Sequence, residues 1–225
     1  MREFLLSSCP VILWTVTALH LLFACLAFGG WKKTKNILWL LTGFITVGLF
    51  YDALILSLGS VLDGGDLLKT LSRLRFVFHG ALIPLIFPMC AYALGFNKFW
   101  KTLVWILTAV LMVLGIAEGF SVELTLQNVA GIARYTSGDG TPAWAQAVSG
   151  ILSYGTVVPL ILAGIIVWIK QKTERLFLSG FFMFLFSALG PATGNFDLIF
   201  LISMFGEVLM VLFFLLYAKK RSGAA

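Results

Sequence analysis

Long apolar stretches, separated by short polar ones, run along the whole of this 225-residue chain. A helix needs about 20 apolar residues to cross the hydrocarbon core of a bilayer, and seven stretches meet or approach that length. They lie near residues 5–29, 37–61, 74–96, 100–119, 145–169, 174–191 and 196–218. The sixth is the weakest, because the segment "GPATGN" interrupts it early. The pattern predicts an all-α polytopic integral membrane protein with seven transmembrane helices, forming a single domain over 1–225.

The composition agrees with this pattern. Hydrophobic residues make up 60% of the chain and the mean hydropathy is +1.00, whereas a soluble domain of this size must keep much of its surface polar. The first stretch is predicted to be an uncleaved helix and not a signal peptide. Its apolar run is longer than that of a signal, and the lysine-rich segment follows it instead of preceding it.

The basic residues predict the orientation. Eleven of the 16 lie on one side of the predicted membrane, and Glu174 is the only acidic residue there. These are Lys32, Lys33, Lys35, Lys98, Lys101, Lys170, Lys172, Arg175, Lys219, Lys220 and Arg221. Positive residues stay in the cytoplasm, so we expect the N-terminus outside and the C-terminus cytoplasmic. We further expect the plasma (cytoplasmic) membrane as the location, membrane lipid as a partner, and no nucleic acid.

Two longer connections lie on the predicted outer side. In 63–72 a Gly-Gly turn is expected to precede a short interfacial helix. In the outer loop 120–144, Glu123, Gln127 and Arg134 are expected on one side of a helix that lies on the membrane surface. The segment "SGDGTP" then predicts a tight turn, and the whole loop can act as a lid.

Ionisable side chains inside a span are costly unless they are paired or hydrated, so they indicate function. At about 1.5 Å per helical residue, Asp52 lies about 15 Å and Glu207 about 18 Å below the outer surface, near the same midplane level. Arg75 and His79 are four residues apart and share one helix face. Together with Glu118 they form a predicted collar around an outward-facing polar pocket, with Asp52 and Glu207 at its floor.

Structural roles remain open for these residues. Arg73 is expected to anchor its helix at the lipid headgroups, and His79 can equally be a structural histidine. Pro84 and Pro88 are expected to kink the third helix below His79 and to leave backbone carbonyls free to face a cavity.

Several chemistries are disfavoured by the sequence. No lysine lies in the interior of a span, which disfavours a retinal Schiff base, and His20 and His79 lie at different depths, which disfavours a haem held by both. The three cysteines lack the spacing of metal ligands. No metal site is predicted and no cofactor can be named.

Three functions therefore stay open. The first is a membrane protein that binds or transports a small or amphipathic ligand through Asp52, Arg75, His79, Glu118 and Glu207. The second is an intramembrane lipid-modifying enzyme in which His79 is the candidate catalytic acid or base beside a carboxylate. The third is an accessory subunit with a membrane-protein partner, whose polar residues only join helices.

Overall fold

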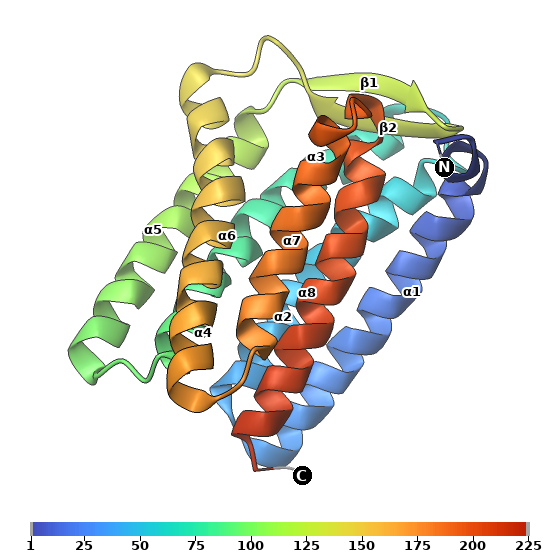
Figure 1. Cartoon of the computed structure of the whole chain (residues 1–225). Helices are drawn as coiled ribbons and strands as arrows, with labels where there is room; N and C mark the ends of the chain where they lie inside the picture. Colours follow the sequence, from blue (N-terminus) through green and yellow to red (C-terminus); the bar gives the residue numbers. More distant parts are fainter. Residues whose placement is uncertain (1, 224–225) are drawn as a thin grey trace.

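A bundle of long helices with a β-hairpin across one end makes up the computed structural model, which describes residues 2–223 (Figure 1). The helices are α1 (Arg2–Thr34), α2 (Ile37–Leu58), α3 (Asp66–Leu82), α4 (Ile86–Ala93), α5 (Lys98–Ser121), α6 (Ala143–Gln171), α7 (Arg175–Ala192) and α8 (Ile199–Arg221). The strands are β1 (Leu124–Val129) and β2 (Ile132–Ser137). The hairpin and the N-terminal end of α1 lie at one end of the bundle, and the C-terminus lies at the other.

All seven predicted spans are confirmed as helical segments that are long and apolar enough to cross a membrane. The sixth, α7, has 18 residues and passes "GP" before it ends at Ala192. The chain is therefore a helical membrane protein. We call the end with α1's first residues and the β-strands the hairpin end, and the opposite end, which carries the basic loops, the basic end.

The third span is broken, as its prolines predict. α3 ends at Leu82, a 3-10 turn (η1, Ile83–Leu85) contains Pro84, and α4 continues from Ile86. Proline lacks the amide donor that an unbroken α-helix requires at this position. The separate interfacial helix expected within 63–72 is wrong, because α3 starts at Asp66 and runs without interruption into the span.

The surface helix expected in 120–144 is also wrong, since this segment forms the antiparallel hairpin β1–β2. Ala130 and Gly131, with φ of 56° and 74°, form its two-residue turn. A turn with both central residues at positive φ matches the twist of paired strands. The membrane-spanning part is thus all-α, and this hairpin is the one pair of strands among the described residues.

The hairpin is packed onto the ends of the helices. Ile132 is fully buried in a cluster with side chains of α1, α2 and α8, among them Leu13 and Met204. The amide of Ala133 donates to the carbonyl of Gly59, just beyond α2, at 2.8 Å. The hairpin is therefore part of the fold.

At the basic end, a large apolar cluster joins α1, α2, α4, α6, α7 and α8. Here α6 and α7 touch through their backbones. A Cβ atom on Gly164 would lie 2.4 Å from Cα of Phe177, and one on Gly180 would lie 3.0 Å from the amide nitrogen of Ile161. Small residues allow such close packing between membrane helices.

Candidate functional site

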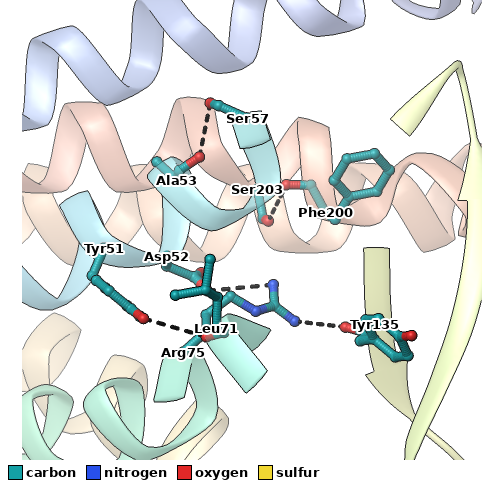
Figure 2. A network of polar contacts seen from close by, with 9 residues as sticks. All are labelled: Tyr51, Asp52, Ala53, Ser57, Leu71, Arg75, Tyr135, Phe200 and Ser203. Atoms are coloured by element: carbon teal, nitrogen blue, oxygen red, sulfur yellow. Dashed lines mark hydrogen bonds and ion pairs between the residues drawn. The ribbon is translucent and has the colours of Figure 1, made fainter. Parts of the chain in front are cut away.

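An ion pair links the second and third spans near the hairpin end. Nη1 of Arg75 in α3 lies 3.3 Å from Oδ1 of Asp52 in α2. Nη2 of the same guanidinium donates to the backbone carbonyl of Tyr135 in β2 at 3.0 Å, as Figure 2 shows. One arginine side chain thus connects two transmembrane helices with the hairpin.

A small charged cavity of about 170 Å³ lies beside this ion pair. Its lining combines residues of α2, α3, α5 and α6: Asp52, Arg75, Phe76, His79, Glu118, Ser149, Leu152 and Ser153. Four of the five predicted ligand-binding residues are therefore brought to one space. We call this space the charged cavity.

Glycines set the distance between the two helices that carry Arg75, His79 and Glu118. A Cβ atom on Gly80 of α3 would lie 2.4 Å from the carbonyl oxygen of Gly115 in α5. Only residues without a side chain let two helix backbones approach so closely. This crossing holds the buried Glu118 against the face of α3 that presents His79.

A second cavity, of about 790 Å³, adjoins the first, and His79, Leu152 and Ser153 line both. Its remaining lining comes mainly from α6, α7 and α8 and is mostly apolar: Leu49, Ile83, Ile86, Tyr154, Thr156, Val157, Met183, Phe184, Ser187, Ala188, Pro191, Ala192, Ile199, Ser203, Glu207 and Met210. We call it the apolar cavity. Its volume falls in the range of about 300–1,000 Å³ that is usual for small-molecule sites.

Glu207 is the one acidic residue of the apolar cavity. It is 6% exposed, and its Oε2 atom accepts no hydrogen bond from any described residue. A carboxyl group without a partner at this depth is unfavourable, so such groups are retained mainly where they serve a function.

Glu207 and Asp52 do not form the directly bonded pair that their shared depth allows. Asp52 is bound to Arg75, and the two acids interact only through electrostatic repulsion across the interior. Asp52 also acts electrostatically on His79 and on His20. The carboxylate of Asp52 is therefore paired with Arg75 and also influences other buried ionisable groups.

The polar groups of Glu118 and His79 are unused within the fold. Glu118 is 4% exposed, and neither its carboxyl group nor the imidazole of His79 takes part in a hydrogen bond or ion pair with the residues described. Both residues line the charged cavity. Both can therefore bind a guest molecule without first breaking a protein contact.

The apolar cavity has an open side between α6 and α7. Two of its lining residues face outward, since Tyr154 is 73% exposed and Phe184 is 50% exposed. Both lie within spans, so this opening faces the space that a bilayer fills. A third, polar cavity of about 410 Å³ lies between α6 and the end of β2, and it shares Ser149 and Ser153 with the charged cavity.

Arg73 and His20 lie apart from the cavities. Arg73 donates to the carbonyls of Gly119 and Phe120 at 3.2 Å each and also to that of Val122, at the end of α5. A guanidinium is stabilised there by the negative end of the helix dipole. His20 is fully buried near the middle of α1, and neither ring nitrogen has a partner among the described residues.

Sequence reasoning missed Ser149 and Ser153, which join the cavities to one another. Their spacing of four residues places both on one face of a helix, which is a signal that was available. It also missed the role of the hairpin, because Tyr135 reaches the site through its backbone carbonyl and not through its side chain.

Arg134 of the hairpin sits against the end of α8. Its guanidinium lies 4.1 Å from the ring centroid of Phe200 and donates to Oε1 of Gln127 at 3.0 Å. Burial, and then the nearby positive charge of Arg75, lowers the pKa of Arg134 to about 10. The hairpin end thus holds two close guanidinium groups over the buried acids.

In the part of the chain that the structure describes, no group of three or more His, Cys, Asp or Glu residues can hold a metal ion. A comparison with known protein families and with curated proteins finds no match for this chain. The chemistry of the site must therefore be inferred from the side chains that line its cavities.

Proposed function

We propose that this protein binds or transports a small amphipathic ligand within the membrane. The polar group of the ligand occupies the charged cavity beside Arg75 and His79, and its apolar part occupies the apolar cavity. The observation that carries the proposal is the wall that these two spaces share, with His79 on both sides of it. A space that is polar at one end and apolar at the other is complementary to an amphiphile and not to an ion or a sugar.

The opening between α6 and α7 supports access from the bilayer. Tyr154 and Phe184 lie at this opening. An apolar molecule dissolved in the bilayer reaches the cavity there without passing through water. The polar cavity at the hairpin end offers a second route, for the polar end of the ligand.

In this proposal the hairpin end faces the outside and the basic end faces the cytoplasm of a plasma membrane. The eleven basic residues of the short loops and the C-terminal tail support this orientation. A membrane-impermeant thiol reagent added to intact cells should label a cysteine in Asp139→Cys and not in Lys172→Cys. The reverse labelling would overturn the orientation.

Native mass spectrometry of the gently extracted protein tests the proposal. The wild type should retain a small molecule or lipid that His79→Ala loses, whereas a variant of the other histidine, His20→Gln, should keep it because His20 lines neither cavity. An equal absence of ligand from all three samples, with a protein partner in fixed ratio, would overturn the proposal and favour an accessory subunit.

A second candidate function is an intramembrane enzyme that modifies lipid. The unpartnered imidazole of His79 beside Glu118 and Asp52 favours it, since a general acid or base must have a free ring nitrogen at the substrate. Lipid extracts of cells that make the wild type or His79→Ala distinguish the two functions. An enzyme would change the abundance of a lipid and its product, whereas a binding protein would only enrich one lipid on itself.

A further inference from the structure

The charges around the cavities identify the class of ligand, in an inference that rests on the proposed function. Four acidic side chains line the three connected cavities: Asp52, Glu118, Asp139 and Glu207. Arg75 is the one arginine or lysine among the lining residues that the structure describes. The linings thus contain more acidic side chains than arginine or lysine side chains.

The positive charge of Arg75 is already compensated by Asp52, although its Nε donor has no partner among the described residues. Nη1 pairs with Asp52 and Nη2 donates to the carbonyl of Tyr135. A carboxylate or phosphate headgroup that accepted from Nε would add a second negative charge beside Asp52, and it would also face Glu118. An anionic amphiphile therefore fits the site poorly.

The acids that remain are free of cationic partners. Glu118 and Glu207 are each more than nine-tenths buried, line adjoining cavities, and make no ion pair within the described part of the chain. Oε2 of Glu207 accepts no hydrogen bond at all there. A carboxyl group in this state needs a donor, and an ammonium group supplies three donors and a compensating charge.

We infer that the ligand is a single-chain amphiphile with a cationic amine head, which lies between Glu118 and Glu207 where the two cavities meet at His79. Its alkyl chain occupies the apolar cavity toward Tyr154 and Phe184. Asp139, in the polar cavity beyond Ser149, adds a negative charge on the route from the hairpin end. The amine thus meets acidic groups along the route from the hairpin end to the site.

Three probes with the same chain length test this inference: n-dodecylamine, dodecanol and laurate. Each is titrated into the protein in lipid nanodiscs, and the saturable rise in Tm gives the apparent Kd. The proteins are the wild type, the double variant Glu118→Gln/Glu207→Gln, and Glu3→Gln, which changes an exposed acid of α1 outside the cavities. Partition of the probes into the bilayer affects all three proteins equally.

The wild type and Glu3→Gln should bind dodecylamine more tightly than either other probe, and the double variant should bind it at least about tenfold more weakly, as expected for the loss of charged hydrogen bonds. Tighter binding of laurate or dodecanol, or an unchanged Kd for the amine in a double variant that folds normally, would overturn the amine inference alone. If no probe gives a saturable shift and native mass spectrometry finds no retained molecule, the proposed function itself fails. Should the double variant not fold, Glu207→Gln alone gives the same comparison.

Discussion

At the basic end of the bundle, a group of polar side chains is hydrogen-bonded within the fold, although the buried hydroxyl of Thr173 has no partner among the described residues. The hydroxyl of Tyr217 donates to Oε1 of Gln171 at 3.0 Å, and Nε2 of Gln171 donates to the carbonyl of Ala93 at 2.8 Å. At the hairpin end, by contrast, Glu118, Glu207 and His79 lack such partners and line cavities. The basic end thus resembles an ordinary core more closely than the hairpin end does, where three polar side chains that line cavities have no hydrogen-bond partner among the described residues.

A single pair of helices repeats this contrast. α6 and α7 touch through Gly164 and Gly180 at the basic end, but their residues nearer the hairpin line the apolar cavity. The cavity is therefore a local feature of a well-packed bundle. Substitutions at both ends of the bundle test this contrast and are given in decreasing order of their expected effect on stability.

The largest effect is expected from Arg75→Ala, which leaves Asp52 as an unpaired charge inside a span. The free energy of unfolding should fall by about 3 kcal/mol. At the basic end, Arg175→Ala removes a hydrogen bond of 2.7 Å to the carbonyl of Leu216 but leaves no buried carboxylate, so the loss should be about 1.5 kcal/mol. Unfolding in mixed detergent micelles measures both variants.

A double-mutant cycle isolates the ion pair. Because Asp52→Asn removes the charge that Arg75→Ala leaves behind, the double variant should lose less stability than the sum of the two single variants. Strict additivity would show that the contact between Asp52 and Arg75 does not contribute to stability.

The same substitution at two glycines of α6 compares its two halves. Gly164→Ala places a methyl group against the backbone of Phe177 and should destabilise by about 1–3 kcal/mol. A methyl group at Gly155, in the half beside the cavity, meets only the side chain of Ile151 at 3.5 Å. Gly155→Ala should therefore leave stability unchanged or raise it by up to about 1 kcal/mol through helix propensity. Equal losses of Tm at both sites would contradict the packing difference.

Removal of one hydroxyl tests how firmly the hairpin is fixed. The hydroxyl of Tyr135 donates to the carbonyl of Gly64 at 2.7 Å, so Tyr135→Phe should cost about 1 kcal/mol. Tyr154→Phe is the matched control, since that exposed side chain has no such bond among the described residues, and its Tm should not change. If the Tm of Tyr135→Phe also stays unchanged, the hairpin is held without this bond.

The smallest effect on stability, and the largest on binding, is expected from Ala188→Phe. This side chain fills space in the apolar cavity, so the free energy of unfolding should change by less than about 1 kcal/mol while the retained ligand is lost. Ala147→Phe adds the same ring to an exposed position of α6 outside the cavities and should keep the ligand. Native mass spectrometry measures the retained ligand in both variants. If Ala188→Phe still retains the ligand, the ligand binds outside the apolar cavity.

The sequence predicts the spans well because the thickness of a bilayer fixes the length of an apolar helix. It also predicts the break at Pro84, because proline has no backbone amide hydrogen to donate within a helix. The hairpin is not predicted, because its strands have only six residues each and Ala130-Gly131 is a weak turn signal. The alternation of apolar and polar residues in "LTLQNV" is the indication that favoured a strand.

For the site, the sequence indicates how deep each candidate residue lies in the membrane. It does not indicate toward which neighbouring helix the side chain points. Depth suffices to select Asp52, Arg75, His79, Glu118 and Glu207, which all line one of two adjoining cavities. It does not reveal that Arg75 pairs with Asp52, because their contact depends on how α2 and α3 are rotated. The small and apolar residues of α7 in the cavity wall carry no chemical signal, so only the packed structure identifies them.

The most direct test of the central claim compares what lies beside two positions in a native membrane. A diazirine-bearing amino acid is placed at Ser187 in the apolar cavity or at Leu162 on the exposed face of α6, and the adducts formed on illumination are identified by mass. Position 187 should give one dominant adduct that dodecylamine competes away, while position 162 should give a mixture of bulk phospholipids. The same phospholipid mixture at both positions would contradict a specific ligand in the cavity.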